Sequence, residues 1–233
     1  DRDGRETMIT LGDFQFPSST TECQVSVIEA KSKVRKEIQI GSLLRADVKW
    51  DLDLALGDLR HAVEAFDKQD AALSLHSGRY YHGRRREFHV TPVPSGLVAW
   101  IELTALTLDR YERGMTLYTH EGTVSFGLGR FSLFNLGNWK APLFLTFEPD
   151  APLDRLQVQT SDDFLSLEEN LPAGHVITTD SEKRELLVQG RNRYSIAHGC
   201  FPFLRPGINT LTVRFHPASA KVRCVIQYRD VWV

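Results

Sequence analysis

Hydrophobic and polar residues alternate with a period of two along most of this chain, which is typical of β-strands with one buried face. The strongest run covers residues 97–109, where Ala99, Ile101 and Leu103 share one face. Residues 46–56 show the same alternation, so we expect a strand there too. Shorter alternating runs, separated by turn residues, continue almost to the end of the sequence. The pattern predicts a mainly β protein.

The period changes to that of a helix in one segment. Over residues 58–69, Leu59, Val63 and Phe66 recur on one side and charged residues occupy the other. Asp58 suits the start, because a negative charge stabilises the positive end of the helix dipole. We expect one α-helix, at residues 58–69.

The character of the sequence changes near residues 110–122, where charged residues and glycines interrupt the strands. The helix precedes this segment. Short strands separated by turns such as Pro206-Gly207 follow it, which is typical of a β-sandwich. We therefore expect two domains, residues 1–113 with the helix and residues 114–233 without one.

The amino-acid composition excludes several classes of protein. The chain has 233 residues, 42% of them hydrophobic and 25% charged, as in ordinary globular proteins. A formal net charge of −2 argues against a dedicated nucleic-acid binder, because phosphate contacts require surplus Lys and Arg. No run approaches the roughly 20 apolar residues of a membrane span. Residues 1–7 are polar, so we expect no signal peptide, and Met8 is a candidate original start.

Cysteine and histidine positions do not indicate a metal site or a disulfide. Cys23, Cys200 and Cys224 lie far apart in strand-like segments, so we expect buried free thiols and a reducing compartment. His76 and His82 come closest to a metal cluster with His89, but no carboxylate follows them at ligand spacing.

Catalytic motifs are missing as well. Asp162-Asp163 could serve acid–base chemistry, but neighbouring residues on a strand point to opposite faces. The chain contains neither a GxSxG turn nor a complete phosphate-binding loop. We expect no catalytic residues, no cofactor and no metal.

Two basic segments and one tryptophan remain as candidates for contacts with partners. Trp139 follows a turn beside several phenylalanines, which favours a sandwich core but leaves open a carbohydrate platform or a subunit interface. An arginine triplet on a strand edge is often simply solvated. The candidates for an oligomer interface are the positive charges of two segments: Lys31, Lys33, Arg35, Lys36, Arg84, Arg85 and Arg86.

Motifs of the second half resemble the distal tail protein (Dit) family of long-tailed, siphovirus-type bacteriophages. Residues 135–142 follow the family's turn Asn-x-Gly-x-x-x-Ala-Pro. Residues 201–212 follow Phe-Pro-x-Leu-x-Pro-Gly-x-Asn-x-(Ile/Leu)-Thr. Gln189-Gly190 stands where the family usually has Asn-Gly. The resemblance covers most of the chain after Leu11 and is firmest in the second half.

The resemblance implies a structural protein of the virion tail tip, made in the bacterial host cytoplasm. Its implied fold is mainly β, with an N-terminal tail-tube-like β-sandwich carrying one α-helix and a C-terminal galectin-like β-sandwich. The N-terminal domains would form a homo-hexameric ring between the tail-tube protein and the tail hub, and DNA would pass through its lumen. Receptor-binding proteins are further implied partners. The alternative is a carbohydrate-binding module used in host recognition.

Overall fold

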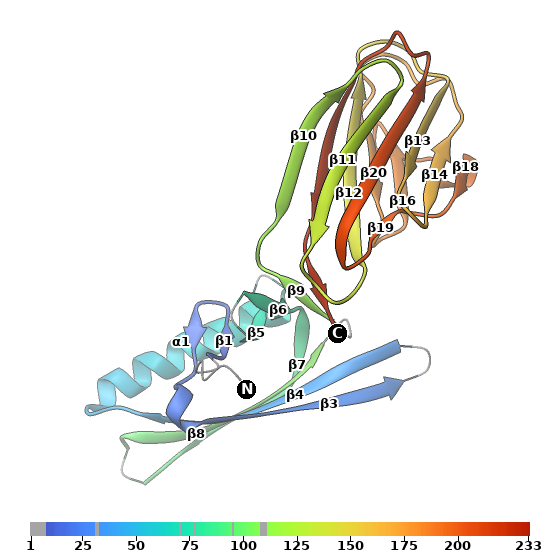
Figure 1. Ribbon diagram of the computed structural model, residues 1–233. Helices are drawn as coiled ribbons and strands as arrows, with labels where there is room; N and C mark the ends of the chain where they lie inside the picture. The colour runs from blue at the N-terminus through green and yellow to red at the C-terminus, as the bar shows by residue number, and fades with distance from the viewer. Residues whose placement is uncertain (1–7, 31–32, 70, 77, 95, 108–110) are drawn as a thin grey trace. The chain divides into compact units, whose positions relative to one another are not determined.

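The computed structural model describes residues 8–30, 33–69, 71–76, 78–94, 96–107 and 111–233. Most of these residues lie in β-strands, and the described part of the chain contains one α-helix (Figure 1). The prediction of a mainly β protein with one helix is confirmed. The chain divides into two compact units, Asp1–Met115 and Thr116–Val233.

The larger sheet of unit 1 is antiparallel and four-stranded, in the order β3 (Thr21–Ala30), β4 (Lys33–Arg45), β8 (Val98–Thr107), β7 (Gly83–Pro92). β3 and β4 form a long hairpin. Alternation sets the buried face of β8, since Ala99, Ile101 and Leu103 are buried as the sequence predicts. β3 and β7 are the edge strands.

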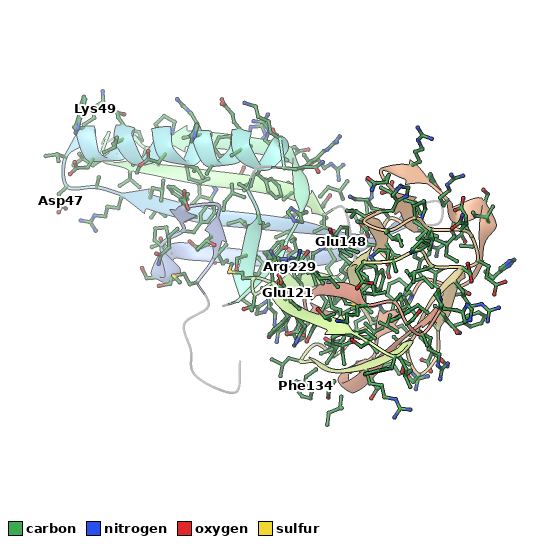
Figure 2. All side chains as sticks on the ribbon, turned by 90° about the horizontal axis from the view of Figure 1, so that it is seen from above. Asp47, Lys49, Glu121, Phe134, Glu148 and Arg229 are labelled. Atoms are coloured by element: carbon green, nitrogen blue, oxygen red, sulfur yellow. The ribbon has the colours of Figure 1, made fainter. Side chains whose placement is uncertain are left out.

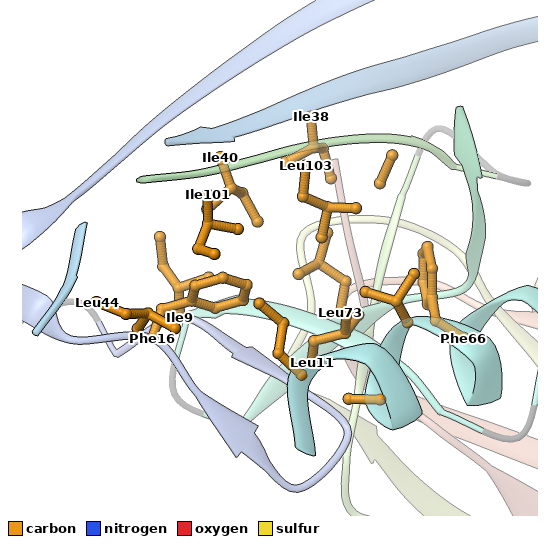
Figure 3. Packing of buried hydrophobic residues seen from close by; sticks show 14 of the residues in the cluster. Ile9, Leu11, Phe16, Ile38, Ile40, Leu44, Phe66, Leu73, Ile101 and Leu103 are labelled. Carbon is orange, nitrogen blue, oxygen red and sulfur yellow. The ribbon is translucent and has the colours of Figure 1, made fainter. Parts of the chain in front are cut away.

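A smaller sheet and the helix cover one face of this larger sheet. The smaller sheet runs β2 (Phe14–Gln15), β1 (Thr10–Leu11), β5 (Leu73–His76), β6 (Arg79–Tyr81), β9 (Glu112–Gly114), with a short 3-10 turn η1 (Ser18–Thr20) after β2. Figure 3 shows Ile38 and Ile101 from the larger sheet facing Phe16, Leu73 and the helix. The core of unit 1 lies between these layers.

The helix α1 spans Lys49–Asp67 and is longer than the sequence predicts. The expected strand at residues 46–56 is therefore wrong. Leu52 is buried with Leu59, Val63 and Phe66, and these positions share one helical face. Leu52 fits a period of two and a period of 3.6 equally well, so alternation alone could not exclude a helix.

Unit 2 is a β-sandwich of two antiparallel sheets. One sheet runs β10 (Tyr118–Val124), β21 (Val222–Tyr228), β12 (Ala141–Pro149), β15 (Ile177–Asp180), β16 (Glu185–Val188), β17 (Arg191–Asn192), and β19 (Phe203–Leu204) also pairs with β12. The other runs β11 (Leu128–Asn135), β20 (Gly207–His216), β13 (Arg155–Gln159), β14 (Phe164–Leu167), β18 (Ala197–Gly199). A 3-10 turn η2 (Tyr194–Ile196) and the short strand β22 (Val231–Trp232) complete the described elements.

A buried asparagine holds the turn that carries the first sequence motif. The side-chain amide of Asn135 donates to the carbonyl oxygens of Trp139 at 2.8 Å and Leu204 at 3.2 Å. Its Oδ1 accepts from the backbone N–H of Gly137 at 2.9 Å. A Cβ on Gly137 would lie 2.0 Å from the carbonyl oxygen of Val231, so no larger residue fits. This turn is fixed by its sequence.

The second motif uses the same device. The amide of Asn209 donates to the carbonyl oxygens of Arg205 at 2.8 Å and Gly207 at 2.9 Å. Its Oδ1 accepts from the backbone N–H of Arg205 at 2.9 Å. Gly207 has φ +89°, a conformation that favours glycine. Both motifs are thus structural: they close turns of the sandwich.

Candidate assembly surfaces

The basic segment of the β3–β4 hairpin is only partly described. Lys31 lies outside the described residues, and of Lys33 only the backbone is described. The ammonium of Lys36 donates to the Tyr81 hydroxyl at 2.9 Å and lies 5.1 Å from the ring centre. Burial lowers the pKa of Lys36, and the charge of Glu112 opposes this shift. Lys36 is therefore held by contacts within its own unit. Arg35, the neighbouring candidate, is partly exposed.

The arginine triplet lies on the edge strand β7. The guanidinium of Arg85 pairs with Asp67 at 2.9 Å, and its backbone N–H donates to the same carboxylate at 2.9 Å. Arg86 pairs with Glu37 of β4. Arg84 is exposed, and no ion pair is found for it within the described residues. Two arginines of the triplet thus stabilise the unit, and Arg84 remains available.

Strand pairing brings the two basic segments together. Leu106 of β8 pairs with Glu37 of β4 on one side and with Arg84 of β7 on the other. The ion pair of Arg86 with Glu37 joins β7 and β4 directly. The candidate interface residues that the structure describes therefore lie at one end of the larger sheet.

The outward face of the larger sheet is polar and acidic at its centre. Glu22, Gly41, Glu102 and His89 pair in one row across all four strands. The ring of Trp100 lies over Gly41, where an added Cβ would come within 3.0 Å of it. A shallow hollow of about 400 Å³ follows this face, lined by Glu22, Gln24, Gln39, Glu87, His89, Trp100, Glu102 and Thr104 among others.

Apolar side chains are exposed where α1 begins. Trp50 and Leu54 are 76% and 56% exposed, and Val48 is 55% exposed. The exposed carboxylates Asp47, Asp51 and Asp53 surround them, and Figure 2 shows Asp47 and Lys49 at this end of the helix. The three apolar residues and the three aspartates together are called the helix-start patch: Asp47, Val48, Trp50, Asp51, Asp53 and Leu54.

Sequence reasoning missed the helix-start patch because it placed Trp50 and Leu54 on the buried face of a strand. Their spacing of four residues was the available signal. It puts both side chains on one face of a helix, and that face lies away from the stripe of Leu52 and Leu59. Exposed large apolar residues grouped in this way mark an interaction site more often than scattered ones do.

Apolar side chains are also exposed along the edge strand β3. Val25 and Val27 are 45% and 62% exposed, although they lie on the core side of the sheet. Beside them a hollow of about 490 Å³ is lined by Ile9, Phe16, Cys23, Leu75, His76 and others. We call Val25, Val27 and Lys36 the hairpin patch; Arg35 alternates to the opposite, outward face of the same hairpin. An uncovered edge strand offers both backbone hydrogen bonds and apolar contacts to a partner.

The cysteines differ from the expectation of three buried thiols. Cys224 of β21 is buried, but Cys23 and Cys200 are exposed. Cys23 lies on the core side of the edge strand β3, where it lines the hollow beside Phe16 and Leu75. Cys200 follows β18, an edge strand of the second sheet of the sandwich. Alternation shows which face a residue takes but not where the covering layer ends.

His76 and His82, two of the three histidines that came closest to a metal cluster, make an ion pair and a packing contact. His76 lies 2.7 Å from Glu112, a buried carboxylate that also lies 3.6 Å from Arg79. His82 packs edge-on against Tyr80. No group of three His, Cys, Asp or Glu side chains that could hold a metal occurs in the described ranges. Burial, followed by the Glu112 charge, raises the pKa of Tyr81, so this cluster keeps a neutral phenol.

The aromatic residues near Trp139 divide between core and surface. Phe147 is fully buried, whereas Phe134 and Phe144 are exposed. The sandwich-core interpretation is therefore right for Phe147 and wrong for the other two. Trp139 is 40% exposed, and its backbone N–H donates to the carbonyl of Val231 at 3.1 Å. Its role in glycan or partner contact stays a prediction.

Within the residues described, no helix has the length and apolar character needed to cross a membrane.

Comparison with known proteins agrees with the motifs. Residues 136–232 match the family described as siphovirus-type tail component, C-terminal domain. The crystal structure of the Dit protein of SPP1 matches with a TM-score of 0.58 and 13% identity, over 92% of this chain and 89% of that chain. That protein is described as a paradigm of the hub adsorption apparatus in phages that infect Gram-positive bacteria. No curated protein sequence matches the chain.

The two matches complement each other. The family match covers the segment in which the sequence motifs lie, and the structural match shows that the chain has the Dit fold across both units. The resemblance to the distal tail family is therefore confirmed, and it supports a structural role in a phage tail.

Proposed function

We propose that this chain is the distal tail adaptor of a siphovirus-type phage. In this proposal unit 1 is a belt domain that forms a homo-hexameric ring, and unit 2 is a galectin-like domain outside it. One ring face joins the tail-tube protein and the other joins the tail hub. The observation that carries the proposal is the match of the second half to a tail component family, together with the Dit fold of nearly the whole chain.

Two unlike surfaces of unit 1 support the proposal of a ring. In a ring, each subunit contacts its neighbours through two unlike, complementary patches. The helix-start patch is apolar and acidic, and the hairpin patch is apolar and basic. The strand β4 separates them, since Lys33 lies at the hairpin end and Arg45 shortly before the helix. Thirteen strand residues span about 40 Å at roughly 3.3 Å per residue.

We propose that the helix-start patch of one subunit contacts the hairpin patch of the next. Trp50 and Leu54 would cover Val25 and Val27, and the aspartates would face Lys36, which lies on the same face. Opposite charges at such a contact favour the correct neighbour and the correct orientation. Arg84 lies at the same end of the sheet as the hairpin patch and extends its positive charge.

The polar outward face of the larger sheet is our candidate for the channel lining. Glu22, Glu87 and Glu102 place negative charge at its centre. Carboxylates repel DNA phosphates, so a channel lined in this way lets DNA pass without holding it. The near-neutral charge of the chain is compatible with such a conduit.

Receptor-binding proteins are proposed partners of unit 2, and the absence of a catalytic role is part of the same proposal.

Light scattering on the purified protein tests the ring. The chain has a mass of 26.5 kDa, and the proposal predicts particles of six times that mass, alone or with the tail hub protein. A mass that stays at one chain at high protein concentration, and also in the presence of the hub protein, would contradict it.

A further inference from the structure

A third hollow lies in unit 2, and none of its residues belongs to the surfaces assigned to the ring. Its volume is about 480 Å³, within the range of small-molecule sites. The loop after β14 and the β16–β17 turn form its walls, and Leu171 and Val188 are its buried apolar residues. The polar lining consists of Glu169, Asn170, His175, Gln189, Arg191 and Arg193.

Unpartnered polar atoms gather in this hollow. Among the described residues, five buried side-chain nitrogen or oxygen atoms lack a hydrogen-bond partner, and three of them line the hollow. These three are Glu169 Oε2, His175 Nδ1 and Arg193 Nε. Such an atom destabilises the fold when it stays unsatisfied, because it has lost its hydrogen bonds to water without a replacement. Buried polar groups are normally bonded, so three orphans in one concave site indicate a missing partner.

The chemistry of the three atoms defines that partner. An ionised carboxylate oxygen only accepts hydrogen bonds, and an arginine Nε only donates them. Glu169 and Arg193 are close, because Glu169 Oε1 lies 3.4 Å from the terminal nitrogen of Arg193. The partner must therefore donate and accept within a small space. An ionised carboxylate ligand cannot donate, and the negative charge of either a carboxylate or a phosphate would be repelled by Glu169.

Neighbouring hydroxyl groups of a sugar meet this requirement, because each hydroxyl donates one hydrogen bond and accepts others. The apolar residues Leu171 and Val188, with Pro172 at the wall, offer contacts for the C–H face of a sugar ring. We propose that this hollow binds a saccharide through adjacent hydroxyls, with Glu169 as acceptor and Arg193 as donor. His175 supplies either role, according to its tautomer. The site goes beyond the proposed ring and does not depend on it.

The test is saturation-transfer NMR on the full chain with glucose, galactose, N-acetylglucosamine and glycerol, and a parallel titration with inorganic phosphate. We expect binding of at least one of the three sugars at millimolar concentration, with no binding of phosphate. Glu169→Gln removes the negative charge and replaces one of the two acceptor oxygens by an N–H donor, so it should weaken sugar binding at least tenfold. A second variant, His175→Ala, should also weaken sugar binding and serves as the test if Glu169→Gln does not fold.

Glu168→Gln is the matched control. Glu168 is adjacent in sequence but pairs with Arg155 at 3.0 Å and does not line the hollow, so this variant should bind like the original protein. Three results would overturn the proposal. They are no sugar binding by the folded protein, binding of phosphate in place of sugar, and sugar binding that survives Glu169→Gln and His175→Ala but is lost in Trp139→Ala.

Discussion

At the residue scale, the positions that carry the family resemblance are those whose side chains close turns. Asn135 makes three hydrogen bonds inside one turn, and Asn209 makes three in another. Gly137 is required because its neighbour Val231 leaves no room for a side chain. The motifs therefore indicated the fold of the second half and carried no chemistry of their own.

The Asn135 turn yields a stability prediction. Asn135→Ala should lower the free energy of unfolding of unit 2 by about 1–3 kcal/mol, because it leaves buried backbone groups without partners. Denaturant unfolding measures this effect. Asn138→Ala is the control: its side chain bonds Val233 in an exposed part of the same turn, and we expect a change within about 0.5 kcal/mol. Equal effects of the two variants would refute this account of the turn.

The buried thiol of Cys224 should make the free energy of unfolding depend on pH in the alkaline range. Burial raises the pKa of its thiol from 9.0 to about 12. The unfolded chain therefore loses this proton near pH 9 while the folded chain keeps it, so stability falls as pH rises from about 9 toward 12. The slope from this group reaches about 1.4 kcal/mol per pH unit.

Cys224→Ala should remove that part of the slope when unfolding is measured between pH 8 and 11. Val222→Ala deletes a buried neighbour on the same strand without removing a titrating group, so its slope should match that of the original protein. If both variants keep the original slope, the buried thiol is not its source.

At the element scale, the strands followed from alternation, whereas half of the helix did not. The run 97–109 predicted β8 and its buried face, because no other period fits it. Residues 46–56 satisfied two periods at once, and only the core decides between them: Leu52 packs with the later helical residues. The exposed Trp50 and Leu54 could be assigned to a surface only once the segment was known to be helical.

The two faces of α1 predict opposite outcomes for two substitutions. Leu52→Ala should destabilise unit 1 by about 2–5 kcal/mol, because it leaves a cavity in the core. Trp50→Ala should change its stability within about 0.5 kcal/mol but weaken assembly of the proposed ring. Thermal unfolding and light scattering measure the two effects. A strong loss of stability in Trp50→Ala, with assembly intact, would contradict the helix-start patch.

At the scale of the whole molecule, the sequence predicted the β-rich class, the single helix and the relationship to tail proteins. It could not predict which charges remain free, because that depends on contacts between distant strands. Lys36, Arg85 and Arg86 are held within unit 1 by Tyr81, Asp67 and Glu37 respectively. The polar hollow of unit 2 was equally hidden, since Glu169 and His175 lie in one loop, Arg193 lies in a separate segment after β17, and the three form no motif.

The central claim is that this chain builds a ring at the distal end of a phage tail. Electron micrographs of the purified protein, alone and with the tail hub protein, test it most directly. The account predicts closed rings with six-fold symmetry and a central opening in class averages. Single chains, open filaments or rings of another symmetry under both conditions would contradict it.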